Sequence, residues 1–339
     1  MRALVFHGPG SIAVHDRPDP EPGPGEVLLR ITATGICGSD VHGYTGENGR
    51  RHPDQVMGHE TVAVVAGGDL AGTGLAVGDV VTVNPVLGCL ACPACDAGEE
   101  QTCPDRRVIG VDPAISSAFA DLMVVRARNV VPLAAGIAEE RGALVEPLAV
   151  GYHAARRGGC GPRDAVLVLG GGPIGQACVL AAHRLGAERV VVSEPHPKRA
   201  ALVASLGAEV LDPAEVVAGS AAALGAAPTL VLDAVGSSAT VRDACAASAR
   251  GARIVLVGMN EQELTVPAYA ISTAERQLIG AFCYSREEFA STARWVAEAD
   301  DRVDRLIDGR VPWDGAAAAF ADLASGASDA SKILIRPAR

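Results

Sequence analysis

A glycine-rich turn between an apolar run and a helical stretch is the feature that most constrains how this chain folds. Residues 165–172 (AVLVLGGG) have the length and composition of a buried strand, and a helical pattern follows directly. The pattern G-x-G-x-x-G is met by Gly170, Gly172 and Gly175, with Pro173 and Ile174 inside it. Such glycines permit a tight turn, close approach of a pyrophosphate and close packing of helix on strand. Glycine-rich loops also occur as plain turns, so the pattern needs support from its surroundings.

An acidic residue after the next strand gives that support. The run 189–194 (RVVVSE) ends in Glu194, 19 residues after Gly175, where a carboxylate accepts ribose hydroxyls. The turn is therefore expected to bind a dinucleotide. The charge of Glu194 repels a 2′-phosphate, which favours NAD over NADP. Lys198 and Arg199 keep the NADP alternative open, although both are also expected on the solvated face of the following helix.

Strands and helices alternate from about residue 150 to residue 282. The expected strands are AVLVL, RVVVSE, AEVLD, TLVLDAVG, RIVLVG and QLIGAF, with helices around 173–186, 198–207 and 239–250. This alternation predicts βαβ units and a parallel sheet, hence an α/β class. Residues 1–130 instead show short β-branched runs broken by Gly, Pro and Asp, which predicts a β-rich lobe. A helix is expected at 286–299, and KILIRP (332–337) is expected to be a strand that returns to this first lobe. Alanine-rich stretches near 218–227 and 315–321 are expected to be loops.

Charge and hydropathy exclude several classes of function. The net charge is −11 and no Lys/Arg-rich block is present, so nucleic-acid binding is not expected. No run of about 20 apolar residues exists to span a bilayer, and the N-terminal apolar run is too short for a signal peptide. We expect a cytoplasmic protein of two domains, in which thiols stay reduced.

Four cysteines lie within fifteen positions. Cys89, Cys92, Cys95 and Cys103 follow the spacing C-x2-C-x2-C-x7-C. A short loop of this kind wraps four thiolates around one tetrahedral zinc ion, which leaves no open position and makes a structural site. An iron–sulfur cluster shares some of this spacing logic and stays an alternative, whereas disulfides are disfavoured in a reducing compartment.

A second group of metal-binding residue types lies earlier in the chain. GICGSDVH contains Cys37, Ser39, Asp40 and His42, and MGHE contains His59 and Glu60. Thiolate, imidazole and carboxylate together suit a catalytic zinc ion with three protein ligands and one open position. Taken singly, each residue is ordinary, because a buried cysteine or core histidine is common.

The motifs taken together resemble the zinc-dependent medium-chain dehydrogenases over essentially the whole chain. The resemblance is carried by GICGSDVH, GHE, the four-cysteine loop, VEPLAVGYHA (145–154) and GGGPIG, and the VEPLAV segment is most similar to the polyol branch of sorbitol, butanediol and threonine dehydrogenases. It implies a GroES-like catalytic domain of residues 1–149, completed by 285–339, and a doubly wound Rossmann domain of residues 150–284. It also implies a homodimer or homotetramer, and QLIGAF could extend a sheet across a dimer interface.

The resemblance also assigns site residues. Cys37 and His59 are similar to two catalytic zinc ligands, and the third is Glu60 or Glu146, with the other glutamate supporting the metal or its water. If His59 and Glu60 lie on one extended segment, their side chains point to opposite faces, so joint ligation needs a local bend. Asp40 is similar to the residue that hydrogen-bonds the ligating histidine, although a simple helix N-cap is an alternative.

These assignments imply reversible oxidation of a secondary alcohol or polyol to a ketone, with two zinc ions per chain and NAD. Zinc lowers the pKa of the alcohol, and the alkoxide passes a hydride to the nicotinamide. Ser39 and His42 resemble the relay that carries the proton to solvent. An NADP-linked enzyme, an amino-alcohol dehydrogenase of the threonine type, a metal-free reductase of the superfamily and a non-catalytic binding homologue are the alternatives. His153 and His183 are expected to be structural, whereas Tyr44, Phe119, Cys283 and Tyr284 either line the pocket or belong to the core.

Overall fold

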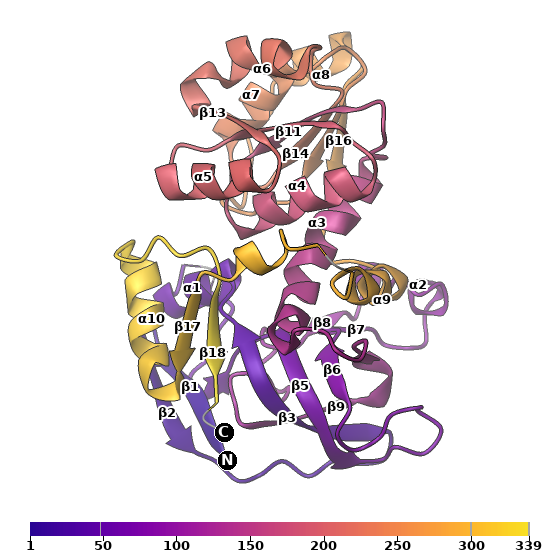
Figure 1. Ribbon diagram of the computed structural model, residues 1–339, viewed down its shortest axis with the longest axis vertical. Helices are drawn as coiled ribbons and strands as arrows, with labels where there is room; N and C mark the ends of the chain where they lie inside the picture. The colour runs from indigo at the N-terminus through magenta and orange to yellow at the C-terminus, as the bar shows by residue number, and fades with distance from the viewer. Residues whose placement is uncertain (48, 299, 338–339) are drawn as a thin grey trace. The chain divides into compact units, whose positions relative to one another are not determined.

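The computed structural model describes residues 1–47, 49–298 and 300–337. The chain forms two compact units (Figure 1). One unit comprises Met1–Glu146 together with the chain from Ser285 onward, and the other comprises Pro147–Tyr284. The first division thus falls three residues before the expected position, and the second falls between Tyr284 and Ser285, at the expected position. Among the described residues, no helix has the length and apolar character needed to cross a membrane.

The unit Pro147–Tyr284 is built on a six-stranded parallel sheet in the order β13-β12-β11-β14-β15-β16. The strands are β11 (Ala165–Leu169), β12 (Arg189–Ser193), β13 (Glu209–Leu211), β14 (Leu230–Asp233), β15 (Arg253–Leu256) and β16 (Gln277–Gly280). The helices are α4 (Pro173–Arg184), α5 (Pro197–Ser205), α6 (Val216–Leu224), α7 (Ser238–Ala247) and α8 (Ala268–Thr273), preceded by α3 (Val145–Arg157), which starts at the end of the other unit. In order of appearance the strands run 3-2-1-4-5-6, which is the doubly wound Rossmann arrangement. The expected α/β class is confirmed.

The other unit is β-rich, as expected. Its strands are β1 (Arg2–Gly8), β2 (Ser11–Asp16), β3 (Glu26–Gly35), β4 (Gln55–Val56), β5 (Glu60–Gly68), β6 (Val80–Val83), β7 (Val86–Leu87), β8 (Arg107–Val108), β9 (Leu122–Arg126), β10 (Val130–Pro132), β17 (Gly309–Pro312) and β18 (Ile333–Arg336). Its helices are α1 (Gly38–Thr45), α2 (Pro93–Asp96), α9 (Arg286–Trp295) and α10 (Trp313–Ser325). Within the described residues, the main sheet has the order β10-β6-β5-β3-β18-β17, with β9 also paired to β3.

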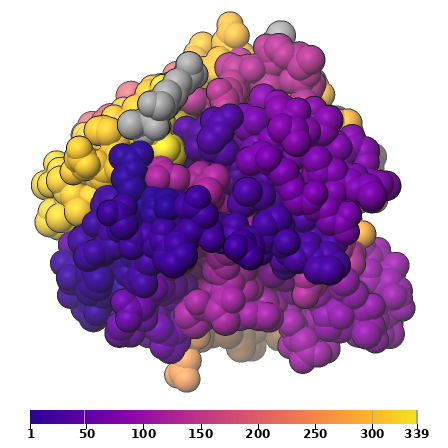
Figure 2. Space-filling view, turned by 90° about the horizontal axis from the view of Figure 1, so that it is seen from below, coloured from indigo at the N-terminus to yellow at the C-terminus, as the bar shows by residue number. Residues whose placement is uncertain are grey.

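The C-terminal segment completes the β-rich unit, which confirms the expected return of the chain. Strand β18 pairs antiparallel with β3 at Leu334↔Gly35 and Ile335↔Thr34. Helix α10 packs on α1, β2, β17 and β18. Figure 2 shows the yellow C-terminal segment against the indigo N-terminal part of the chain. This pairing matters for function because β3 leads directly into the first candidate metal ligand.

Both alanine-rich stretches were predicted wrongly as loops. Residues 218–227 lie largely in α6, and residues 315–321 lie within α10. Alanine is the best helix former, and both helices end at a glycine in the left-handed conformation, Gly225 and Gly326. The helix predicted at 286–299 is the shorter α9, and Ala299 lies outside the described residues.

Two of the four candidate pocket residues belong to the core of the β-rich unit. Phe119 is fully buried and packs edge-on against Phe320 with ring centroids 5.6 Å apart. Tyr44 packs against the same ring, and its hydroxyl donates to the Gly10 carbonyl over 2.9 Å. These contacts explain both aromatic residues without a substrate.

Candidate active site and metal centres

Cys37 stands where β3 passes into α1. It is the N-cap of α1, and its backbone N–H donates to Oδ2 of Asp40 over 3.2 Å. Asp40 therefore caps the helix from the third helical position. The simple N-cap interpretation of Asp40 is wrong, because Cys37 holds that place. The same carboxylate lies beside His59, with Oδ1 3.7 Å from Nδ1.

A bend in the chain brings His59 and Glu60 to one place. Strand β5 starts at Glu60, so His59 precedes the strand, and Gly58 before it has a φ of 97°. A side chain at Gly58 would also press on the Phe119 ring. Glycine is required in this conformation, which breaks the strand alternation. The ligand atoms of Cys37, His59 and Glu60 consequently lie within 4.8 Å of one another.

Glu60 is paired with a lysine from the C-terminal segment. Nζ of Lys332 lies 2.6 Å from both carboxylate oxygens of Glu60 and also donates to the Ile36 carbonyl over 3.2 Å. Both side chains are almost fully buried. Only glycine fits at position 35 on β3, because a Cβ there would overlap Oε2 of Glu60.

The electrostatics of this cluster favour a cation. Burial lowers the pKa of His59, but the charge of Asp40, the hydrogen bond and charge of Cys37, and the charge of Glu146 outweigh it and raise the pKa to about 10. Burial also lowers the pKa of Lys332, and the charge of Glu60, followed by those of Cys37 and Glu146, raises it overall. The surrounding anions thus favour positive charge on the His59 imidazole and on the Lys332 ammonium group.

The donor set fits a divalent metal ion. With Cys37 as thiolate, four anions (Cys37, Asp40, Glu60 and Glu146) face two permanent cations, Arg51 and Lys332. A divalent ion would balance these buried charges, and thiolate, imidazole and carboxylate are ligands that zinc accepts. Nδ1 of His59 is buried without a hydrogen-bond partner among the described residues.

The two residues predicted to carry the proton to solvent lie on one helix. Ser39 and His42 both belong to α1, where Ser39 is partly buried and His42 is about half exposed, with Nδ1 3.9 Å from Glu47.

His183 has Nδ1 3.0 Å from the Ala187 carbonyl at the end of α4, which agrees with the structural role expected for it. His153 is buried on α3.

The four-cysteine loop holds its sulfur atoms in one group. The Sγ atoms of Cys89, Cys92, Cys95 and Cys103 lie within 4.8 Å of one another, and Cys89 and Cys95 are 4.0 Å apart. A disulfide needs about 2.05 Å, whereas sulfurs on a tetrahedral zinc ion at about 2.3 Å lie about 3.8 Å apart. Donation from the backbone N–H of Cys89, over 3.4 Å, lowers the pKa of Cys103 to about 7. The separation therefore suits a metal ion and not a disulfide.

Sequence reasoning missed Glu100, which connects the four-cysteine loop to the rest of the β-rich unit. Glu100, which is buried, accepts hydrogen bonds from Arg128 over 2.9 Å and from Arg286 at the start of α9. The backbone N–H of Arg286 also donates to the Gly98 carbonyl. A glutamate in a loop has no sequence signal that names partners 28 and 186 residues away.

The glycine-rich turn has the backbone geometry that its sequence predicts. Gly170 has a φ of 91°, and a side chain there would meet Val235 at 2.7 Å. A Cβ at Gly175 would overlap the Gly170 carbonyl oxygen, so helix and strand approach at that point. Gly172 is the N-cap of α4 and has nothing within 4 Å of its Cβ direction. The N-terminus of α4, which starts at Pro173, is thus accessible to an anion.

Glu194 lies against this turn. Its Oε2 accepts the backbone N–H of Gly171 over 2.7 Å, and its Oε1 accepts that of His196 over 2.7 Å. The carboxylate is buried, and each oxygen has a further lone pair. On α5, Lys198 is exposed and Arg199 is partly buried, and Nε of Arg199 is without a hydrogen-bond partner among the described residues.

Comparison with known proteins relates both units of the chain to dehydrogenases. Residues 23–135 match the family described as Alcohol dehydrogenase GroES-like domain, and residues 173–298 match the family described as Zinc-binding dehydrogenase. Human sorbitol dehydrogenase is 32% identical over 96% of this chain and 93% of its own. Two solved structures, at 26% and 28% identity, superpose with TM-scores of 0.90 and 0.88 and cover 99% of both chains. They are an Escherichia coli CFT073 alcohol dehydrogenase (rspB) complexed with NADH and a Sinorhizobium meliloti 1021 protein bound to NADP.

Proposed function

Because the chain belongs to the zinc-dependent medium-chain polyol dehydrogenase family, we propose that it catalyses reversible, NAD-linked oxidation of a secondary alcohol or polyol to a ketone. The observation that carries this proposal is the buried group of Cys37, His59 and Glu60, which fits a divalent ion. Zinc bound there would supply Lewis acidity that lowers the pKa of a substrate hydroxyl.

The protein's own residues divide the remaining work. Cys37 and His59 would hold the ion. Glu60 is the better supported third ligand, because its carboxylate oxygen lies with their ligand atoms while Lys332 holds its orientation. Glu146 contributes negative charge to the same place and would orient water or substrate. Ser39 and His42, on α1, would move the hydroxyl proton towards solvent, a role that the exposure of His42 supports.

NAD is proposed over NADP because Glu194 presents a buried carboxylate beside the glycine-rich turn. The specific observation that favours the NADP alternative is the unpaired Nε of Arg199 on α5. The four-cysteine loop would hold a second, structural zinc ion, giving two per chain. Reduced thiols in both groups fit the proposed cytoplasmic location.

A homodimer or homotetramer is also proposed. Strand β16 is the edge of the parallel sheet, and Leu278 on it is 38% exposed, with Tyr269 of α8 84% exposed nearby in sequence. An edge strand with exposed apolar side chains can pair with the same strand of a second copy of this chain. Light scattering of the wild type and of Leu278→Lys tests this: a monomeric wild type would refute the proposal, and a smaller assembly in the variant would locate the interface.

The decisive test is a panel of polyols, diols, secondary alcohols and amino alcohols screened for NADH and NADPH formation. We expect activity with polyols and NAD that is abolished in Cys37→Ala while the variant stays folded. Full activity in Cys37→Ala would contradict the catalytic site, and activity confined to amino alcohols or NADP would favour the alternatives.

A further inference from the structure

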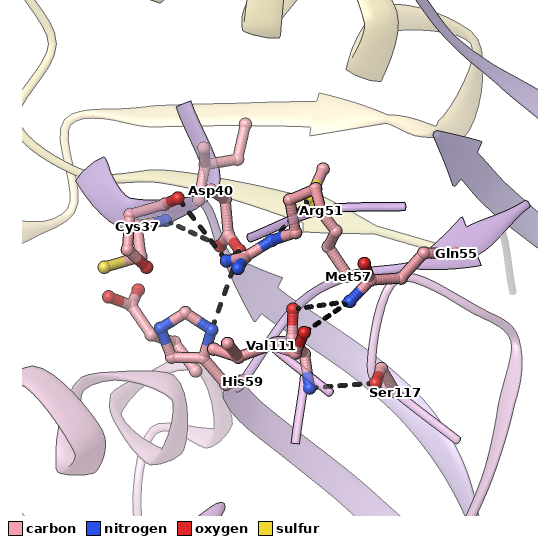
Figure 3. Close-up of polar contacts among 12 residues, drawn as sticks. Cys37, Asp40, Arg51, Gln55, Met57, His59, Val111 and Ser117 are labelled. Atoms are coloured by element: carbon pink, nitrogen blue, oxygen red, sulfur yellow. Dashed lines mark hydrogen bonds and ion pairs between the residues drawn. The ribbon is translucent and has the colours of Figure 1, made fainter. Parts of the chain in front are cut away.

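We propose that Arg51 is a positioning residue for the candidate catalytic metal site, acting through Asp40 on Cys37 and His59. The inference rests on the proposed function, since it assigns a role to a residue of that same site. Figure 3 shows the arrangement: the Arg51 guanidinium lies over Asp40, and Asp40 lies between Cys37 and His59. Nothing in the spacing of the sequence motifs points to Arg51.

Arg51 makes contacts that fix its guanidinium in place. One terminal nitrogen lies 3.3 Å from Oδ1 of Asp40 and 3.4 Å from the Ser39 carbonyl, and Nε lies 3.2 Å from Sδ of Met57. The side chains of Arg51 and Asp40 are 2% and 0% exposed. A buried pair of this kind is held strongly, because losing one partner leaves the other charge uncompensated.

Asp40 connects this pair to two candidate ligands. Its Oδ2 accepts the backbone N–H of Cys37 over 3.2 Å, which sets the backbone that carries the thiolate. Its Oδ1 faces Nδ1 of His59 at 3.7 Å, and that nitrogen is otherwise buried without a partner. One carboxylate thus acts on the chain at the first ligand and on the ring of the second.

The surrounding chain is shaped to admit the arginine. A Cβ on Gly43, in α1, would lie 2.5 Å from Cγ of Arg51. Glycine at this position therefore leaves room for the Arg51 side chain to reach Asp40. The guanidinium also removes the need for His59 to be the sole counter-charge of Asp40. A carboxylate held beside Nδ1 of His59 also limits how the imidazole ring can turn, and so fixes the direction of the other ring nitrogen.

A purely structural ion pair would share these contacts, so the test measures metal binding directly. The full chain is stripped of metal and titrated with Zn²⁺ against a chromophoric chelator, and separately with Co²⁺, whose absorption bands report ligand geometry. Cys37→Ser identifies which binding step belongs to the catalytic site. If Cys37→Ser removes no step, the proposed metal site itself fails, independently of Arg51.

We expect Arg51→Met to weaken the step assigned to Cys37 by about tenfold to hundredfold, to change the Co²⁺ spectrum, and to leave the other step unchanged. Arg51→Lys keeps the charge without the planar fork and should fall between Arg51→Met and the wild type. Arg50→Met, at the exposed neighbouring position, is the matched control and should bind as the wild type does. Wild-type affinity and spectrum in Arg51→Met, with only a lower melting temperature, would overturn the proposal.

If Arg51→Met does not fold, Arg51→Met combined with Asp40→Asn removes both buried charges together. That double variant should fold and still bind the catalytic ion more weakly than the wild type. Wild-type affinity in a folded double variant would equally overturn the proposal.

Discussion

Nζ of Lys332 lies 2.6 Å from each carboxylate oxygen of Glu60, across 272 residues of sequence. The two side chains are 3% and 1% exposed, so the pair is isolated from solvent. Strand β18 brings the lysine to this point by pairing with β3 just before Cys37. The C-terminal segment therefore does more than complete a sheet, because it carries the cation that balances a candidate ligand.

Replacing Lys332 by Met should destabilise the metal-free protein by about 3–5 kcal/mol, because Glu60 is left buried without a counter-charge. The loss should be smaller in the zinc-loaded protein, where the metal can take over part of that role. Urea denaturation with and without zinc measures both. Lys332→Met with Glu60→Gln removes both charges and should recover much of the stability; an additive loss in the double variant would show that the pair is not coupled.

The sequence predicted what depends on local pattern and missed what depends on long-range contact. The turn at Gly170, the strands of the parallel sheet and the four-cysteine loop each lie within a short stretch of chain, where residue type and spacing fix the geometry. Lys332 and Arg51 act on Glu60 and Asp40 through tertiary contacts that spacing does not encode. A lysine at the start of the apolar strand KILIRP was a usable signal, since a charge expected in the core needs a partner.

Loss of the four-cysteine site should act on stability before activity. Replacing Cys95 by Ser should remove about one zinc ion per chain and lower the melting temperature, because the loop loses the ion that its thiolates surround. Cys160→Ser, outside both metal groups, is the control. Metal analysis and thermal unfolding are the measurements. Lost activity with an unchanged melting temperature would mean that the two metal sites are assigned the wrong way round.

Glu194→Gln should lower NAD affinity about tenfold and raise the affinity for NADP relative to NAD, because the charge that accepts ribose hydroxyls and repels a 2′-phosphate is gone. The amide keeps the shape of the side chain and one of its two acceptor atoms, so one backbone N–H loses its partner, whereas Glu194→Ala would leave both backbone N–H groups unpaired and disturb folding more. Calorimetric titration with both nucleotides is the measurement, and Glu188→Gln, an exposed position before β12, is the control. Unchanged NAD affinity would refute the assignment.

Asp121 offers a pH-dependent test of how the two ends of the β-rich unit are joined. It accepts the backbone N–H of Arg2 over 2.8 Å, the Arg2 guanidinium over 3.3 Å and Nε1 of Trp313 over 2.8 Å, so it joins β1 to α10. Partial burial raises the pKa of Asp121, but the hydrogen bonds from Arg2 and Trp313 and the charge of Arg2 outweigh it and leave the pKa lowered. Its stabilising effect is therefore complete above the ordinary aspartate pKa of about 4 and is lost as the pH falls through the lowered value.

Asp121→Asn should accordingly be less stable than the wild type by about 1 kcal/mol near pH 7, a modest figure because the carboxylate is partly exposed. The difference should begin to shrink as the pH drops below about 4, where the unfolded chain becomes protonated at Asp121 while the folded chain does not, and it should be gone once the pH lies below the lowered pKa. Denaturation of both proteins from pH 7 to pH 3 measures the gap, and the exposed Asp322→Asn on α10 should show none at any pH. A gap that stays constant down to pH 3 would mean that the side chain acts through packing, and that its charge does not hold the two chain ends together.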